Sequence, residues 1–400
     1  MNQEIPENWI KVKFKELAKQ KSVRVDDPGE SGYEKYVGLE HLDSGELVVK
    51  RYGSTSDVTS TMKRFEKDDI LFARRNTYLR RVSVAPFDGV CSGDIIVLEP
   101  ILKHIIKGFL PIFMQFEPFE NKIIALSAGA FSKRIKWNQL AEEEVVIPSI
   151  EEQKKIVETI WSIQDNIEKN NEVISVAVKL KCGLLNKLLT KGIGHEKFKK
   201  TEIGSIPEKW NIYPLSDVIT IIGGGTPKTT NPEYWNGSIP WISVEDFPKD
   251  GMYIESTVKR ITEKGLNESS TKLLQQDDLI ISARGTVGLV AKIAKPMAFN
   301  QSCYGISSTD KVTSNYAYYL LMILVESIKH SSYGSTFKSI TKKNFDLFNV
   351  AVPPIEEQCQ ISEKLDQFYV LQKKALENID YLYDLKKKLT DECLKGEVRV

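Results

Sequence analysis

An internal repeat is the feature of this sequence that most restricts how it can fold. Three segments of the first half recur in the second: Ile5–Trp9 as Ile206–Trp210, Asp69–Thr77 as Asp278–Thr286, and Val146–Gln153 as Ala351–Gln358. A repeat on this scale indicates one structural unit of about half the chain, present twice. The 400 residues are therefore expected to form two similar units.

Each copy of the repeat combines two kinds of sequence. From the tryptophan to the repeated Ile-Pro or Val-Pro, short apolar runs such as Asp94–Leu98 and Asp278–Ile281 alternate with Gly, Pro, Asn and Asp, which is typical of strands and turns. After the prolines, apolar residues follow at alternating spacings of three and four, the period of a coiled-coil helix. The sequence predicts an α+β fold: two strand-rich α/β domains joined by two long helices, related by an internal pseudo-twofold repeat.

The two helical segments carry matching seams. The predicted seam positions are Ile156, Ile160, Ile163, Ile167, Asn170, Ile174, Ala177, Lys181, Leu184 and Leu188 in the first helix, and Ile361, Leu365, Phe368, Gln372, Ala375, Ile379, Leu382, Lys386, Leu389 and Cys393 in the second. Two such helices most simply pack against each other. Polar seam positions fix the register of such a pair at some loss of stability.

Helix start and stop signals divide the chain further. Pro148 and Pro353 each precede an acidic first turn, as at helix starts, and Gly192 and Gly396 each follow a basic last turn, as at helix ends. The expected segments are a first domain (1–148), a first long helix (149–192), a linker (193–204), a second domain (205–353) and a second long helix (354–397).

Composition restricts the partners and the cellular setting. The 55 Lys and Arg residues nearly balance the 54 Asp and Glu residues, so a site for a polyanion must be a local patch. No apolar run reaches about 18 residues and the start lacks the order of a secretory signal, which favours a soluble cytoplasmic protein without a membrane partner. Five scattered cysteines, none in a CxxC pair, favour reduced thiols over disulfides or a zinc ribbon.

Segments that resemble catalytic motifs are incomplete. Gly223–Thr229 resembles a phosphate-binding loop, but Pro227 stands where the motif needs glycine, and a tight turn is favoured. Asn231–Tyr234 differs at Glu233 from the loop that grips the target amine in amino-methyltransferases. Glu152-Gln153-Lys154 has the Glu-x-Lys form of many nuclease sites, but it lies in the first turns of a long helix, where helix capping is the favoured role for acids.

The histidines give no support for a metal site either. All four are isolated and lack the spacing of metal-binding motifs. We therefore assign no catalytic residue, no metal ligand and no cofactor to this chain, and look instead for binding surfaces.

The clearest binding candidate is an arginine-rich segment after a strand-like run. Its polar residues are Arg74, Arg75, Asn76, Thr77, Arg80 and Arg81. The planar guanidinium can bond a phosphate or the major-groove edge of guanine, which makes the cluster a candidate DNA contact. For any single arginine, a solvated, salt-bridged turn is the simpler alternative. The repeat keeps only Arg284 and Thr286 at the matching place, so the two units share a frame and differ in their contact residues.

One further pair of segments and one single loop have the composition of loops that contact a DNA backbone. The pair is the matching stretches rich in Gly, Ser and Lys, and the single loop is a polar one found in the second unit alone. Their candidate residues are Lys133, Arg134 and Lys136 in the first unit, and Lys338, Lys342, Lys343, Lys228, Thr229 and Thr230 in the second. The aromatic residues Phe131, Trp137 and Phe337 are expected to anchor these stretches in the core rather than to stack on bases.

These features together resemble the specificity subunit of type I restriction-modification enzymes. The resemblance rests on the Pro-x-x-Glu-Glu-Gln motif at both helix starts, on Gly224–Ser243 with its Gly-Gly-Thr-Pro and Ile-Pro-Trp-Ile-Ser sequences, and on Leu394–Glu397 at the end of the second helix. It covers nearly the whole chain. The first unit departs from the pattern, because Lys21–Pro28 stands where the second unit has Gly-Gly-Thr-Pro.

The resemblance implies a function and partners. The domains would each recognise one half of a bipartite, asymmetric double-stranded DNA target, and the helices would form an antiparallel spacer that sets the gap. Two methyltransferase (modification) subunits and restriction subunits would carry the chemistry, with S-adenosylmethionine, ATP and Mg, in a prokaryotic cytoplasm. This chain would then be non-catalytic. The alternatives are a coiled-coil scaffold that spaces two protein-binding domains, and a degraded nuclease.

Overall fold

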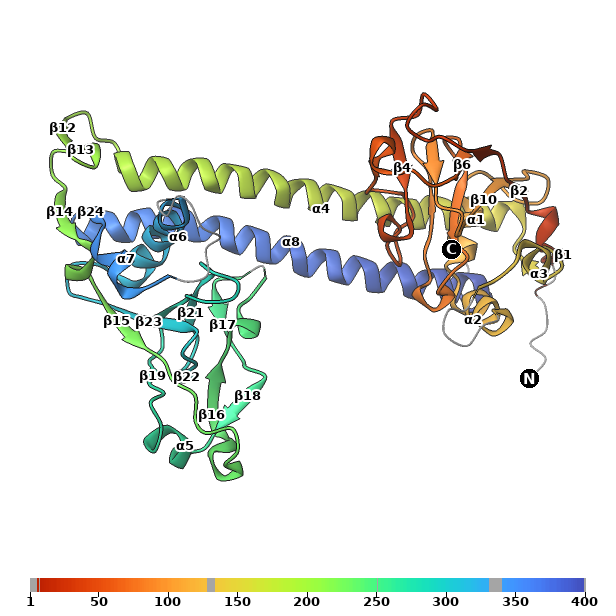
Figure 1. Ribbon diagram of the computed structural model, residues 1–400. Helices are drawn as coiled ribbons and strands as arrows, with labels where there is room; N and C mark the ends of the chain where they lie inside the picture. The colour runs from red at the N-terminus through yellow and green to blue at the C-terminus, as the bar shows by residue number, and fades with distance from the viewer. Residues whose placement is uncertain (1–5, 7, 128–133, 250, 331–339, 399–400) are drawn as a thin grey trace. The chain divides into compact units, whose positions relative to one another are not determined.

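The computed structural model describes residues 6, 8–127, 134–249, 251–330 and 340–398 (Figure 1). The chain forms two compact units: Met1–Asn171 with Glu377–Val400 is unit 1, and Glu172–Leu376 is unit 2. Two long helices, α4 (Ile150–Lys191) and α8 (Ile355–Lys395), run through both units, so each unit contains one globular domain and half of each helix. The predicted α+β fold with a repeated domain and two long helices is confirmed. The expected segment boundaries remain a prediction.

The described residues of unit 1 form three sheets and three short α-helices. A four-stranded sheet has the order β2-β10-β7-β8, a five-stranded sheet has the order β3-β6-β9-β4-β5, and β1 pairs with β11. The bounds are β1 Ile10–Lys13, β2 Ala18–Lys21, β3 Arg24–Val25, β4 Lys35–Val37, β5 Gly53–Ser54, β6 Met62–Phe65, β7 Ile70–Ala73, β8 Val82–Val84, β9 Gly89–Cys91, β10 Ile95–Pro100, β11 Glu144–Ile147, α1 Phe109–Met114, α2 Glu117–Leu126 and α3 Trp137–Ala141.

Unit 2 repeats this plan with five strands in its first sheet and four in its second. Its sheets have the orders β15-β23-β20-β21-β17 and β18-β16-β22-β19, and β14 pairs with β24 and β12 with β13. The bounds are β12 Phe198–Thr201, β13 Gly204–Pro207, β14 Asn211–Pro214, β15 Ile219–Gly223, β16 Trp235–Ile242, β17 Tyr253–Ile254, β18 Lys259–Ile261, β19 Leu273–Leu274, β20 Leu279–Ser282, β21 Val290–Ile293, β22 Met297–Phe299, β23 Cys303–Ser308, β24 Asn349–Val352, α5 Glu263–Asn267, α6 Ser314–His330 and α7 Lys342–Asp346.

The repeat is visible in the sheet topology. The order β2-β10-β7-β8 in unit 1 corresponds strand for strand to β15-β23-β20-β21 in unit 2. The pair that closes each domain also corresponds: Ile10 lies opposite Ile147 in unit 1, and Asn211 lies opposite Val352 in unit 2. The similar sequence segments therefore occupy equivalent strands.

The central strands are apolar because both faces of their sheet are covered. In β20, Leu279 and Ile281 belong to a core that includes residues of α6 and both long helices, while Ile280 points to a second core on the other face. Successive side chains of a strand alternate between faces, so a strand covered on both sides needs an unbroken apolar run. This accounts for Asp278–Ile281 and, in unit 1, for the buried run of β7.

The helices pack antiparallel within each unit. In unit 1, Gln164 contacts Lys386 (2.7 Å) and Asn170 contacts Asn378 (3.2 Å), so positions advance along α4 as they recede along α8. In unit 2, Leu188 near the end of α4 shares a core with residues near the start of α8. All twenty predicted seam positions are buried or half-buried, which confirms the heptad pattern.

One polar seam position is strongly constrained. The ammonium of Lys386 is almost fully buried and donates to the Gln164 side chain and to the Gly45 carbonyl at 2.6 Å. Burial lowers the pKa of Lys386 to about 8. A buried ammonium is stable only where such acceptors meet it, so this seam position ties both helices of unit 1 to the loop at Gly45.

The repeated Glu-Glu-Gln motif joins each domain to its helix. The fully buried Gln153 amide donates to the carbonyls of His104 and Pro148 (both 2.9 Å) and accepts from the Ile106 N–H. In unit 2, the equally buried Gln358 makes the same three bonds, with Lys311, Pro353 and Thr313, at 2.8, 2.9 and 2.8 Å. Each glutamine thus pairs three backbone groups that would otherwise be buried without partners.

The second glutamate of the motif explains the repeated tryptophan. The Trp9 indole N–H donates to Glu152 (3.0 Å), and the Trp210 indole donates to Glu357 (2.9 Å). Glu357 also accepts from the Ile193 N–H, just beyond the end of α4, and contacts the His195 ring at 2.8 Å. The repeated tryptophan and the repeated Glu-Glu-Gln motif therefore contact each other where the first strand of each domain meets the start of the long helix.

We predict that Gln358→Leu destabilises the protein by about 2 to 4 kcal/mol, because each buried backbone group left without a partner costs ~1–3 kcal/mol. Gln153→Leu should have a similar effect. Calorimetric melting of the full chain checks this, with Gln360→Leu, at an exposed position of the same helix, as the matched control. Equal melting temperatures for Gln358→Leu and Gln360→Leu would contradict the role given to the motif.

Candidate nucleic-acid interface

The arginine-rich segment of unit 1 is a tight loop between β7 and β8. A single 3-10 turn, Thr77–Leu79, is flanked by Asn76 and Arg80, whose φ angles of 54° and 49° lie in the left-handed region. Side chains other than glycine seldom adopt this conformation, so neighbouring contacts must hold the loop. The loop exposes Tyr78 (57 %) and Leu79 (39 %), which composition alone did not single out.

The arginines of this loop differ in their surroundings. Arg80 lies 3.1 Å from the Glu120 carboxylate and bonds Asn121, and Arg81 donates to the Leu39 carbonyl at 2.6 Å. Burial lowers the pKa of Arg81. Thr77 is buried and bonds the Ser127 hydroxyl at 2.9 Å. These contacts show that Thr77 and Arg81 help to hold the loop; DNA contact by them remains a prediction.

The second predicted segment of unit 1 adjoins the first. Arg75 and Arg134 form an antiparallel β-bridge, the Ile135 N–H donates to the Arg74 carbonyl, and both arginine side chains contact Asp94. Lys136 is exposed. Trp137 packs edge-on against Phe14, in agreement with its expected role as an anchor. Lys133 and Phe131 lie outside the described residues.

Unit 2 has the same frame of backbone hydrogen bonds around Arg284, the single arginine of its matching loop. The N–H groups of Ala283 and Arg284 donate to the Ser302 carbonyl, as the Arg74 N–H donates to the Asp94 carbonyl in unit 1. The Ile340 N–H donates to the Ala283 carbonyl, as Ile135 does to Arg74. Gly285, with φ of 77°, takes the left-handed position that Asn76 holds in unit 1. Arg284 and Thr286 are exposed at this loop.

The Gly-Gly-Thr-Pro segment lies beside the loop of Arg284. A Cβ at Gly224 would overlap the carbonyl oxygen of Asn300, so the close approach of the two backbones requires glycine. The Gly225 N–H donates to the Phe299 carbonyl (3.0 Å), and the Thr226 hydroxyl bonds Gln301. The Gly225 N–H is therefore already used within the protein, which supports the turn over the phosphate-binding loop.

The remaining candidates of unit 2 lie around these two loops. Lys228, Thr229 and Thr230 are exposed beyond the Gly-Gly-Thr-Pro segment. Lys342 is exposed and donates to the Ile221 carbonyl (3.0 Å), just before that segment, and Lys343 beside it is exposed. Lys338 and Phe337 lie outside the described residues. The described candidates of unit 2 thus come from three chain segments that meet at one end of β15 and β20.

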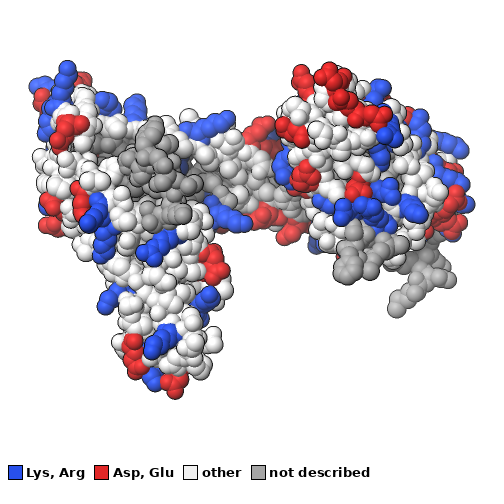
Figure 2. All heavy atoms as spheres, in the orientation of Figure 1, with Lys and Arg blue, Asp and Glu red and all other residues white. Residues whose placement is uncertain are grey.

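Charge on unit 1 is locally sorted, although the whole chain is nearly neutral. Figure 2 shows acidic side chains gathered at the upper edge of unit 1 and a band of Lys and Arg across the lower part of the same face. The visible face of unit 2 carries scattered charges of both signs. A net charge of +1 is therefore compatible with a local basic surface on unit 1.

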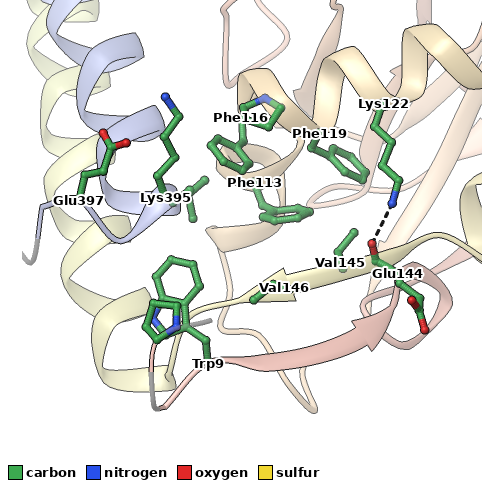
Figure 3. Close-up of a pocket in the computed structure, with 13 residues that line it drawn as sticks. Trp9, Phe113, Phe116, Phe119, Lys122, Glu144, Val145, Val146, Lys395 and Glu397 are labelled. Atoms are coloured by element: carbon green, nitrogen blue, oxygen red, sulfur yellow. Dashed lines mark hydrogen bonds between the residues drawn. The ribbon is translucent and has the colours of Figure 1, made fainter. Parts of the chain in front are cut away.

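Of the candidate residues, Arg80 lines a cavity of about 220 Å³ in unit 1 together with Glu120 and Lys386. A groove of about 440 Å³ in unit 1 lies between the end of α8, the short helices α1 and α2, and β11, and is lined by Trp9, Phe113, Phe116 and Phe119 (Figure 3). None of the predicted DNA-contacting residues lines it. The groove belongs to the framework at the repeated tryptophan.

Metal binding, membrane spanning and disulfide formation each place requirements on the part of the chain that the structure describes. No group of three or more His, Cys, Asp or Glu side chains there could hold a metal ion. No helix in the same residues has the length and apolar character needed to cross a membrane. The five cysteines are free thiols, and burial raises the pKa of Cys91 and of Cys303 to about 12.

The fold defines a class of protein with two similar, non-identical sheet domains, each of which carries a loop held by equivalent backbone bonds. The chain belongs to the family of the type I restriction modification DNA specificity domain, whose family model matches residues 6–177 and 207–381. This confirms the resemblance to type I specificity subunits and gives the chain two DNA-recognition domains.

Known relatives and solved structures are similar to this chain along nearly its whole length. A putative type I restriction enzyme specificity subunit, MjaX, from Methanocaldococcus jannaschii is 27% identical, and the match covers 99% of this chain and 95% of that one. A solved structure from work on the assembly of a type I restriction-modification system has a TM-score of 0.61 at 22% identity, covering 99% and 100% of the two chains. A type I S subunit from M. genitalium has a TM-score of 0.58 at 16% identity, covering 98% and 97%. The structural matches show the same fold.

We predict that Glu120→Gln stabilises the protein at pH 8. Burial raises the pKa of Glu120 to about 7, above its unfolded value near 4.5, even though Arg80 favours the ionised form. Ionised Glu120 therefore weakens folding above pH 7, by roughly 3 kcal/mol at most, and this penalty fades as the pH falls from 7 towards 4.5.

Melting temperatures of the variant and the unaltered protein at pH 8 and pH 5 check this. The gain should be present at pH 8 and small at pH 5. Glu117→Gln on the same helix, where Glu117 is more exposed and also lies near Arg80, is the matched control. A gain of equal size at both pH values would contradict the assignment.

Proposed function

We propose that the two units each recognise one half of a bipartite, asymmetric DNA target. The observation that carries this proposal is that Arg75 and Arg284 occupy equivalent places in the same frame of backbone bonds, while the loops around them differ in sequence. Equivalent placement supports the same kind of ligand for both units, and different loops support different half-sites. The family supports DNA as that ligand.

Two kinds of contact would act together. Exposed Lys and Arg side chains supply attraction to phosphates that is independent of sequence and weakens with salt. A few donors aimed at base edges supply discrimination of about 1–3 kcal/mol per good bidentate contact. Arg75, Arg134 and Arg284 are the candidates for base contacts, and the lysines around them are the candidates for phosphate contacts.

The helices would act as a spacer and the partners would supply the chemistry. α4 has 42 residues and α8 has 41, so each is about 60 Å long at a rise of about 1.5 Å per residue. We propose that this pair sets the gap between half-sites. Two methyltransferase subunits and restriction subunits, which bind S-adenosylmethionine, ATP and Mg, would assemble with this non-catalytic chain in a prokaryotic cytoplasm.

We expect Arg75→Ala to weaken recognition of the first half-site and Arg284→Ala that of the second, each by about 1–3 kcal/mol if the arginine bonds a base edge. Binding of the chain with its modification subunits to duplexes altered in one half-site at a time measures this. Lys154→Ala, which removes a charge from the exposed face of α4, is the control and should bind normally.

Two results would count against DNA recognition by these loops. Arg75→Ala and Arg284→Ala could bind as well as the Lys154→Ala control, which would move the recognition surface elsewhere. The unaltered protein could lack affinity for any duplex selected from a random pool, which would favour the alternative of a scaffold for two protein-binding domains.

A matched insertion tests the spacer. Four residues, about one helical turn and ~6 Å, inserted after Asn171 in α4 and before Glu377 in α8 keep the two helices paired. At ~3.4 Å per base pair, the gap between half-sites should lengthen by one or two base pairs, while the base sequence of each half-site stays the same. Selection from random duplexes measures the gap, and a changed half-site sequence at an unchanged gap would refute the spacer role.

A further inference from the structure

The two units differ at one position within their common frame. A three-residue turn joins β9 to β10 in unit 1 and β22 to β23 in unit 2, and its last residue is Asp94 in unit 1 and Ser302 in unit 2. The carbonyl of that residue accepts from the arginine-bearing loop in both units. Asp94 and Ser302 are therefore equivalent in position and different in charge.

Asp94 holds two arginines of unit 1 together. One of its carboxylate oxygens lies 3.4 Å from a guanidinium nitrogen of Arg75 and 3.2 Å from one of Arg134. The Asp94 side chain is 22 % exposed, whereas Arg75 and Arg134 are 43 % and 48 % exposed. The carboxylate is thus the less exposed end of the cluster, and the guanidinium groups reach solvent.

The turn that carries Asp94 is itself fixed. The Lys63 ammonium donates to the carbonyls of Gly93 (3.0 Å) and Ile95 (2.8 Å), on either side of Asp94. The Arg74 N–H donates to the Asp94 carbonyl at 3.0 Å. These bonds fix the backbone of Asp94, which defines the place from which its carboxylate reaches the two arginines.

Unit 2 lacks this arrangement. Ser302 carries no charge, and within the described residues no Asp or Glu forms an ion pair with the exposed Arg284. Within this cluster alone, Arg75, Arg134 and Asp94 sum to one positive charge, which is the charge that Arg284 carries at the equivalent place in unit 2. Unit 1 therefore gains a second guanidinium without a second net positive charge.

We propose that Asp94 is a specificity-determining residue of the first recognition domain, which presents Arg75 and Arg134 as a paired donor set to the acceptor edge of a guanine. This proposal rests on the proposed DNA recognition by the same loops. Guanine offers N7 and O6 as adjacent acceptors in the major groove, and guanidinium donors match them. A carboxylate next to the donors repels phosphate oxygens, so the pair favours an uncharged base edge over the DNA backbone.

Asp94→Ser transplants the residue of unit 2 into unit 1 and is the direct test. It raises the local charge by one and removes the carboxylate that both arginines contact, so non-specific binding should tighten and the slope of log affinity against log salt should steepen by up to ~0.9. Discrimination against a substituted first half-site should fall by about 5- to 100-fold. Discrimination at the second half-site should be unchanged.

Three further variants distinguish the positioning role of Asp94 from a general effect of charge and from a folding defect. Asp43→Ser removes an equivalent charge from the exposed Asp43–Arg51 pair of unit 1 and should leave discrimination intact. Asp94→Asn keeps the shape of the side chain and should lose discrimination as Asp94→Ser does, which guards against a folding defect, with melting temperatures measured alongside. Ser302→Asp should make the salt slope shallower at the second half-site.

The experiment uses the full chain with its modification subunits and the duplex that the unaltered complex selects from a random pool. Normal first half-site discrimination by Asp94→Ser and Asp94→Asn would overturn the role of Asp94 and leave the proposed function intact. An equal loss in Asp43→Ser would show a general charge effect and also overturn it. Failure of the unaltered complex to select any duplex would instead refute the proposed function itself.

Discussion

The buried amide of the Pro-x-x-Glu-Glu-Gln motif is the interaction on which the rest of the molecule depends. Gln153 and Gln358 each pair three backbone groups at the place where a sheet domain meets a long helix. An amide is suited to this task because it donates and accepts at once and carries no charge that burial would penalise. Together with the hydrogen bond between the adjacent Glu and Trp, this amide joins each domain to the part of the helix in its own unit. The loops of a domain are therefore positioned relative to the helices.

Local regularity decides which parts of this structure the sequence predicts. The helix seam could be predicted residue by residue, because its period is set by neighbours three and four positions apart. The repeated motifs and the family resemblance gave the two-domain organisation. The tips of the candidate loops were found because basic residues without neighbouring acids stand out in composition, although their role in binding DNA is still a prediction.

Contacts between distant segments are what the sequence pattern did not reveal. The arginine loop contains no acid, yet Arg75 meets Asp94 and Arg80 meets Glu120, from a turn and a helix further along the chain. Composition within a window also treated four arginines alike, whereas Arg81 is part of the scaffold and Arg75 faces solvent in part. The equivalence of Asp94 and Ser302 follows from matching the strands and turns of the two copies, and not from matching their amino-acid sequences.

A duplicated frame lets two surfaces diverge separately. Some of the bonds that hold each loop in place are made by backbone groups, as where the carbonyls of Asp94 and Ser302 accept from the arginine-bearing loop in both units. Side chains at those positions are therefore released from supporting the loop and can change without loss of its shape. Since each unit also carries its own domain-to-helix contact, a change of side chain in one unit leaves the frame of the other intact. Independent change of two half-sites, at a gap fixed by the helices, is then the physical consequence of this architecture for the proposed function.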